Sequence, residues 1–222
     1  KGQQARGRKE DQMKIETFVT GIIGTNTYVA YNETTKEAVL VDPAACTKKL
    51  MHFIEEEGLS MKAVLLTHGH FDHIMGIDGF RKVYDVPVYV GEKEAGLITD
   101  AHWNQSDIYT KGYTFSEAVY VQDGKILRLA GYDFQVFFTP GHTPGGVCYY
   151  VASEGILFSG DTLFYHSVGR TDFEGGSMSD LVRGIEDKLL PLPDETKVLP
   201  GHMDATTIGE EKKYNPFLRR HV

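Results

Sequence analysis

The sequence predicts an α/β fold, and three features of the chain lead to it. Short β-like runs come first, at residues 15–20, 26–31 and 38–41, with Gly, Asn and Thr turns between them. A wholly apolar run at residues 63–66 then has the composition of a strand covered on both faces. Beyond it, strand-like runs alternate with helix-like segments. Local strand pairing followed by this alternation predicts sheets with helical layers against them.

The first half of the chain carries clear helix boundaries. Thr47 can cap the amino end of a helix, and Gly58 is a stop signal directly after residue 57. A second helix is expected around residues 74–84, and a further strand at residues 86–90.

The second half continues the sheets. Strands are expected at residues 126–129, 134–138, 147–151, 156–158 and 197–199. Ser177 and Asp180 form a capping box before a helix that Pro191 ends. The last helix is expected at residues 206–213.

Composition limits the class of protein. With 222 residues, of which 41% are hydrophobic, the chain is long enough for one domain with a sizeable core. The net charge of −8 argues against nucleic acid as a partner. No apolar run approaches the ~18 residues of a membrane span. We expect a small-molecule substrate and no membrane partner, and the oligomeric state stays open.

The cysteines and the first residues bear on localisation and domain limits. Cys148 lies in an apolar stretch and is expected to be a small buried side chain, while a disulfide with Cys46 is left open. Two cysteines and no signal peptide favour a cytoplasmic protein. Residues 1–12, with one apolar side chain, are interpreted as a disordered tail or a vector-derived remnant, with a basic nucleic-acid arm as the alternative. The domain is expected at residues 13–222.

A block of four metal-binding side chains follows the apolar strand. His68, His70, Asp72 and His73 fall within six consecutive positions. Imidazole and carboxylate are good ligands for divalent metals. Because residues two apart in an extended segment point the same way, His68 and His70 can reach one metal together. Asp72 and His73 come later and can face a second metal.

Three single residues downstream complete a set of seven. His142, Asp161 and His202 each follow a β-like run and a glycine, which lets the backbone bend closely. They are expected on strand-end loops, where a rigid sheet positions functional groups. Seven ligands suffice for two metals if one carboxylate is shared.

This pattern resembles the metallo-β-lactamase-fold hydrolases, and in particular their glyoxalase II-type branch, over residues 14–218. The HxHxDH block, the lone His, the lone Asp and the last His come in the family order. Residues 167–173 and 213–218 resemble the short bacterial type II glyoxalases. The resemblance implies an αββα sandwich, in which two mixed β-sheets are flanked by helices.

The resemblance also implies a role for each ligand. One metal would be held by His68, His70 and His142, the other by Asp72, His73 and His202, with Asp161 bridging the two. Seven N/O ligands without a thiolate suit two divalent ions, for which we expect Zn²⁺, with Fe or Mn²⁺ as alternatives.

The ligand types suggest a hydrolytic reaction. Two metals sharing Asp161 would lower the pKa of a common water toward ~7, which supplies hydroxide as the nucleophile. Asp72 and Asp161 are the expected catalytic carboxylates, and Asp72 would orient the nucleophile. A thiolate, with a pKa near ~8.5, leaves more readily than an amine, which favours thioesters over amides.

The resemblance implies S-acyl glutathione thioesters as substrates, with S-D-lactoylglutathione giving D-lactate and glutathione. Arg170 falls where the family has a basic residue that contacts glutathione; the alternative is an ion pair with Asp172. The larger glyoxalase II enzymes carry an added C-terminal helical domain, and this chain ends at Val222, which puts glutathione itself in question.

Other functions stay open. A mononuclear iron persulfide dioxygenase shares the fold and the stretch at residues 169–173. A lactonase or phosphodiesterase would use the same site, whereas a non-catalytic metal-binding module is disfavoured by the complete ligand set. The β-lactamases of this fold usually lack the second His of the block, so His73 argues against that activity.

Several residues beside the ligands are expected to support the site. Asp42 and Asp204 follow strands and are candidates for orienting a ligand imidazole. Tyr165 and His166 are interpreted as loop residues rather than pocket residues. Residues 92–115 are interpreted as a packed surface insertion, with a substrate lid as the alternative.

Overall fold

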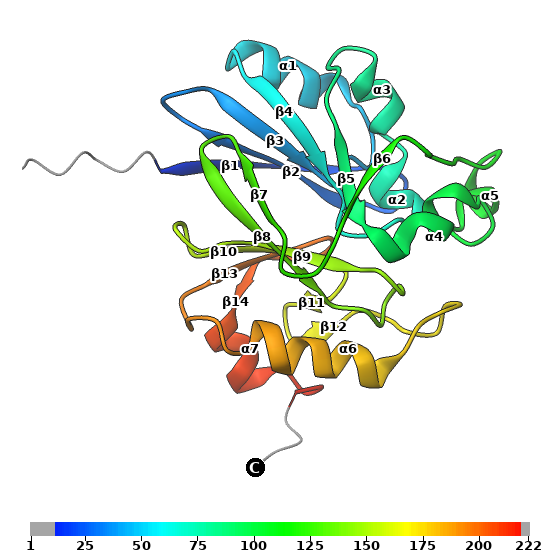
Figure 1. Cartoon of the computed structure of the whole chain (residues 1–222), viewed down its shortest axis with the longest axis vertical. Helices are drawn as coiled ribbons and strands as arrows, with labels where there is room; N and C mark the ends of the chain where they lie inside the picture. The colour runs from blue at the N-terminus through cyan, green and yellow to red at the C-terminus, as the bar shows by residue number, and fades with distance from the viewer. Residues whose placement is uncertain (1–11, 219–222) are drawn as a thin grey trace, which may run out of the picture.

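A computed structural model describes residues 12–218 of the chain. Two six-stranded mixed β-sheets lie in the middle of the molecule, with helices on the outer face of each (Figure 1). This arrangement is the predicted αββα sandwich. The expected tail falls, apart from Gln12, outside the described residues.

The first sheet has the strands in chain order. Its members are β1 (Met13–Thr20), β2 (Thr25–Asn32), β3 (Glu37–Val41), β4 (Ser60–Leu65), β5 (Val88–Gly91) and β6 (Ala118–Val121). The first three strands pair antiparallel, as predicted for a locally paired start. The pairs from β3 to β6 are parallel, which requires crossover connections between them.

The second sheet contains the second half of the chain. In spatial order it consists of β14 (Thr206–Thr207), β13 (Lys197–Pro200), β10 (Ile156–Gly160), β9 (Val147–Val151), β8 (Tyr132–Phe138) and β7 (Ile126–Leu129). Only the β10–β13 pair is parallel. A small antiparallel pair, β11 (Leu163–Phe164) and β12 (Ser167–Val168), follows β10.

Helices cover both outer faces. The first sheet carries α1 (Lys48–Glu56), α2 (Phe71–Ile74) and α3 (Ile77–Arg81), and near them lie the 3₁₀ turn η1 (Glu92–Glu94), α4 (Ala95–Thr99) and α5 (Ser106–Tyr109) (Figure 1). The second sheet carries α6 (Met178–Gly184), which continues as a π-helical turn, η2 (Ile185–Leu189), and α7 (Ile208–Tyr214) (Figure 1).

The apolar side chains form three layers, because each sheet is covered on both faces. Strand β2 shows how the period of two divides them: Tyr28 and Ala30 pack between the sheets, while Val29 packs under the helices. Phe134 and Phe158 fill the layer between the sheets. The third layer lies between the second sheet and α6–α7.

Helix caps follow the sequence signals. The Thr47 side chain accepts a hydrogen bond from the Leu50 N–H, and Gly58 beyond the helix has φ of +64°. Ser177 accepts from the Asp180 N–H in the same way at the start of α6. Both caps satisfy amide groups that have no partner within the helix.

Some predicted elements differ from the structure. Of the helix expected at residues 74–84, only Ile74, the end of α2, and residues 77–81, which form α3, are helical, and Gly76 lies between the two helices. There the Gly76 N–H donates to the Pro43 carbonyl at 2.7 Å, and a Cβ would lie 2.5 Å from that oxygen. The helix expected from residue 206 begins at Ile208, because Thr206 and Thr207 pair with β13. Strand β6 was not predicted, since only Val121 of its four side chains is buried.

The structure also bears on the predictions about the cysteines and about membrane spans. Cys46 and Cys148 are both free, and Cys148 is buried as expected. Within residues 12–218, no helix combines the length and the apolar character needed to span a bilayer.

Candidate metal centre

All seven predicted ligands lie at the carboxyl ends of strands, on one side of the sandwich. The HxHxDH block follows β4 of the first sheet. His142, Asp161 and His202 follow β8, β10 and β13 of the second sheet. Parallel alignment of β10 with β13 brings the last two loops together, as the Gly201 N–H donates to the Gly160 carbonyl at 2.8 Å.

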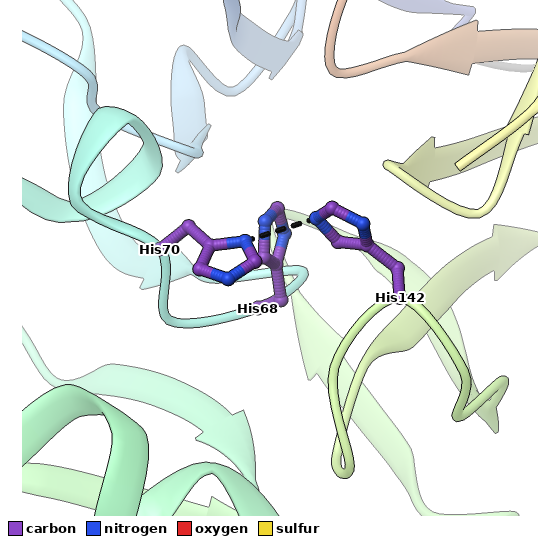
Figure 2. A group of neighbouring side chains, drawn as sticks. All are labelled: His68, His70 and His142. Atoms are coloured by element: carbon purple, nitrogen blue, oxygen red, sulfur yellow. Dashed lines mark hydrogen bonds between the residues drawn. The ribbon is translucent and has the colours of Figure 1, made fainter. Parts of the chain in front are cut away.

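His68, His70 and His142 form the first group of side chains. Their potential ligand atoms all lie within 4.8 Å of one another. His70 Nδ1 is 2.9 Å from His142 Nε2, and the three rings converge although His142 comes from the other sheet (Figure 2). Burial lowers the pKa of His70 to about 3 and that of His68 well below its usual value. Both imidazoles are therefore neutral at physiological pH, which is the form that binds metals.

Asp72, His73 and His202 form the second group, again with ligand atoms within 4.8 Å. Asp72 Oδ2 lies 3.1 Å from His202 Nε2 and 3.3 Å from His73 Nε2. Burial favours the protonated form of Asp72, but His73 and His202 outweigh it and hold the pKa of this carboxyl well below its usual range. Burial lowers the pKa of His202, but Asp72 and Asp161 outweigh it and raise this pKa above its usual value.

Asp161 lies between the two groups. Its Oδ1 is 3.4 Å from His73 Nε2, and its Oδ2 is 3.6 Å from both His142 Nε2 and His202 Nε2. One carboxylate therefore approaches members of both groups, as a bridging ligand must.

The potential ligand atoms include several without a hydrogen-bond partner, and this fits divalent metal ions. His68 Nε2, His73 Nε2 and Asp161 Oδ1 are buried and have no hydrogen-bond partner. Leaving such atoms without a partner is costly, and three together in one cluster fit a site that holds metal.

The local charge balance also fits divalent cations. Asp42, Asp72 and Glu94 are buried around the centre, and among residues 12–218 no lysine or arginine is buried with them. Buried carboxylates without a cation are unfavourable, so positive charge at the centre would stabilise them.

Two ligand imidazoles are oriented by Asp42, as the sequence suggested. Asp42 Oδ2 contacts His73 Nδ1 at 2.9 Å and accepts from the Thr67 hydroxyl at 2.6 Å. Thr67 Oγ1 in turn lies 3.2 Å from His68 Nδ1. These contacts leave Nε2 of both rings facing the centre. Asp204, the other candidate for this role, is exposed.

Further contacts were not anticipated from the sequence. The Thr25 hydroxyl donates to Asp72 Oδ2 at 2.8 Å. Asn26 Nδ2 donates to the Pro200 and Met203 carbonyls at 3.0 and 2.9 Å, which fixes the loop of His202. The start of β2 has a run of buried polar residues, where apolar ones are expected. This run is the feature of the sequence that could have pointed to these contacts.

A cavity of about 400 Å³ opens onto the centre. Besides ligand residues, its lining is largely apolar and includes Ile23, Phe71, Tyr109, Phe164, Phe173 and Met203. Such a lining can accept an organic substrate.

Arg170 lies at the rim of this cavity but is already paired. Its Nε and Nη2 donate to the two oxygens of Asp172, both at 2.7 Å, and the guanidinium stacks 4.2 Å from the Phe173 ring. The ion pair that was the alternative interpretation is thus present. Contact with a substrate stays a prediction.

The insertion at residues 92–115 is packed and also contributes to the cavity. Gln105 and Tyr109 line it, while the Trp103 indole donates to the Glu174 carbonyl at 3.2 Å. His166, interpreted as a loop residue, pairs with Glu210 at 2.9 Å.

Residues 20–202 match the family model described as the metallo-beta-lactamase superfamily. The chain belongs to this superfamily. Curated relatives include the "Probable metallo-hydrolase YqgX" of Bacillus subtilis, 38% identical over 93% of this chain and 98% of that protein. They also include the "Hydroxyacylglutathione hydrolase GloC" of Haemophilus influenzae, 35% identical over 82% of this chain and 88% of that protein.

Solved structures of the superfamily resemble the chain throughout. A protein described as BLEG-1 B3 metallo-beta-lactamase has a TM-score of 0.87 and 42% identity, over 93% of this chain and all of that one. TTHA1623 in a di-iron-bound form has a TM-score of 0.81 and 36% identity, covering 91% of this chain and 100% of that one. ETHE1 from Myxococcus xanthus has a TM-score of 0.76 and 30% identity, covering 91% and 83% respectively.

The family and the cluster together establish the general chemistry. The chain is a metal-dependent hydrolase of the metallo-β-lactamase superfamily, and its His/Asp cluster has the side chains that could hold a divalent metal. The predicted family and fold class are confirmed.

Proposed function

We propose that this protein hydrolyses S-acyl glutathione-type thioesters, such as S-D-lactoylglutathione to D-lactate and glutathione, with two divalent metal ions, of which Zn²⁺ is the expected one. The position of Asp161 between the two groups carries the two-metal part of the proposal. Likeness to the Haemophilus hydroxyacylglutathione hydrolase supports the substrate class.

The seven ligand residues divide into two sets, one for each metal ion. His68, His70 and His142 would hold one ion and Asp72, His73 and His202 the other, with Asp161 shared. When bound, such a metal pair polarises a carbonyl and lowers the pKa of water toward ~7. Our assignment of Asp72 and Asp161 as the catalytic carboxylates follows, since both face the cavity.

The surrounding residues prepare this site for an ester-like carbonyl. Thr25 and His202 hold Asp72 Oδ2, so the carboxylate is fixed before substrate arrives. In hydrolysis, water adds to the acyl carbon, the C–S bond breaks, and the thiolate departs with the electron pair. With a pKa near ~8.5 this thiolate needs little protonation, unlike an amine.

Two observations keep other substrates in the test. The presence of His73 argued against β-lactamase activity. The likeness to a protein described as a B3 metallo-β-lactamase weakens that argument. The relative in a di-iron-bound form keeps iron among the metals to be analysed, and the persulfide dioxygenase alternative, which needs one iron, stays in the panel.

A substrate panel with metal analysis tests the proposal. Purified protein is assayed on S-D-lactoylglutathione, an uncharged acyl thioester, a glutathione persulfide, a β-lactam, a lactone and a phosphodiester, while bound metals are counted. We expect thioester hydrolysis to have the highest kcat/KM. Oxygen consumption with the persulfide, or faster turnover of any other ester or lactam, would contradict it.

A further inference from the structure

Glu94 is a buried carboxylate that the chemistry above does not use. It ends the turn η1, directly after β5, and its side chain is inaccessible to solvent. Its Oε2 accepts the Gly69 N–H and its Oε1 accepts the Gly145 N–H, both at 2.7 Å. Each oxygen therefore binds a different loop.

The two loops are those of the three-histidine group. Gly69 lies between His68 and His70, and Gly145 lies three residues after His142. The first loop leaves the first sheet and the second leaves the other sheet. Glu94 is thus a single side chain that joins both sheets beside the metal centre.

The backbone around Glu94 approaches too closely for side chains. A Cβ at Gly145 would lie 2.6 Å from the Glu94 nitrogen, and one at Gly91 would lie 2.3 Å from the Gly145 carbonyl oxygen. A Cβ at Gly69 would lie 2.6 Å from the Leu97 side chain. Glycine at these positions allows the carboxylate to reach both amides.

From this geometry we infer that Glu94 is a positioning residue, which holds the loops of His68, His70 and His142 at the spacing that one metal ion needs. Gly69 and Gly145 both donate an N–H to Glu94, so both of its oxygens act as acceptors. An ionised carboxylate does this, whereas an amide or a protonated acid offers a donor to one of the two loops. The inference concerns the metal site and holds for any substrate.

Glu94→Gln tests the role with almost no change in size. The amide can accept from only one loop, so the other loop loses its tie. Starting from metal-free protein, competition with a chromophoric zinc chelator should show one Zn²⁺ equivalent weakened by ~10–100-fold. The visible spectrum of the Co²⁺-substituted protein should change as well, and in ¹⁵N-labelled protein the amide proton resonances of Gly69 and Gly145 should shift upfield.

Glu92→Gln is the matched control, because Glu92 lies in the same turn and is exposed. It should leave zinc affinity and the Co²⁺ spectrum unchanged. If Glu94→Gln lowers the melting temperature of metal-free and metal-loaded protein equally, with wild-type zinc affinity and Co²⁺ spectrum, Glu94 only supports the fold and the inference fails.

Glu94→Asp decides the question if Glu94→Gln does not fold. This variant keeps the charge but is one methylene shorter, so it reaches one loop well and the other poorly. Zinc affinity between that of the wild type and that of an unfolded chain, with an altered Co²⁺ spectrum, supports the inference. Wild-type affinity and spectrum would overturn it.

Discussion

At the scale of single residues, Asp161 connects the two halves of the site. Its two carboxylate oxygens approach ligand atoms of both groups. Asp161→Asn preserves its size and removes the charge that would offset two cations. Because losing a ligand should cost more than losing an outer contact, we expect metal affinity and kcat to fall at least ~tenfold.

His166→Asn is a suitable control for Asp161→Asn. His166 has φ of +53°, which asparagine tolerates, and it pairs with Glu210 outside the ligand set. This control should keep its metals. Two retained metals and a near-normal rate in Asp161→Asn would show that the bridge is wrongly assigned.

The pair of Asp72 and His202 should make the stability of the metal-free protein fall with rising pH, while zinc affinity rises. In metal-free protein the pKa of His202 is raised mainly by Asp72, although burial opposes it. The stability from this pair is therefore fully present below pH ~6.5 and is lost as pH rises through the raised pKa. Metal binding needs the neutral imidazole, so zinc affinity should rise over the same pH range.

Melting temperatures between pH 7 and 8.5 check this contrast, because burial lowers the pKa of His68, His70 and His142 and their opposite contribution lies at lower pH. EDTA-treated protein should become less stable with rising pH, while zinc-loaded protein should gain stability relative to it. Parallel curves for the two forms would contradict a metal site at His202.

Arg170 keeps donors free for a substrate even in its ion pair. A guanidinium has five N–H donors, and Asp172 occupies two of them. Because a charge-assisted hydrogen bond contributes ~1.5–3 kcal/mol, Arg170→Ala should raise KM for glutathione thioesters by roughly tenfold. KM for an uncharged thioester should not change.

Stability separates the two roles of Arg170. Its pair with Asp172 is largely exposed, so its loss should barely change the melting temperature. If Asp172→Ala reproduces the KM defect for charged and uncharged thioesters alike, Arg170 only holds its loop.

The ligand residues could be predicted from the sequence, whereas most residues that hold the ligands or their loops in place could not. HxHxDH is visible because its ligands are adjacent, and Asp42 because it ends a strand beside them. Thr25 contacts Asp72 across 47 positions, and Asn26 contacts Pro200 across 174. No local periodicity predicts pairs so distant, and Glu94 was missed for the same reason.

At the scale of elements, the hairpin of β1 and β2 fixes the last ligand loop. Asn26 provides its backbone N–H to Gly201 at 2.7 Å and its side-chain amide to the carbonyls of Pro200 and Met203. Asn26→Ala leaves the Met203 carbonyl without this donor, while the Pro200 carbonyl keeps the Tyr28 hydroxyl at 2.6 Å; the loss should cost ~1–3 kcal/mol. For a chain of this size that lowers Tm by ~2–4 °C per kcal/mol.

Metal affinity should fall with Asn26→Ala as well, because the loop carries His202. Gln122→Ala removes an exposed side-chain amide and is the control. An unchanged Tm and unchanged zinc affinity in Asn26→Ala would show that the hairpin does not support the site.

Elements with strong local signals were predicted, and those set by tertiary contacts were not. Thr47 and Ser177 cap their helices as expected. The break at Gly76 depends on the Pro43 carbonyl, and β6 depends on pairing with β5. Neither partner is near in sequence.

At the scale of the whole molecule, two sheets bring distant loops to one edge. The HxHxDH block comes from the first sheet and His142, Asp161 and His202 from the second. Periodicity predicted strands and helices but not their division between sheets; the family resemblance supplied the sandwich. The centre exists only when both sheets pack, so metal binding and folding should be coupled.

The metal content of the purified protein tests the central claim most directly. After expression with supplemented metal, elemental analysis should find close to two divalent ions per chain, because the two ligand groups share Asp161. One iron per chain, with Asp72, His73 and His202 holding none, would contradict the two-metal hydrolase and favour oxygen chemistry at the three-histidine group.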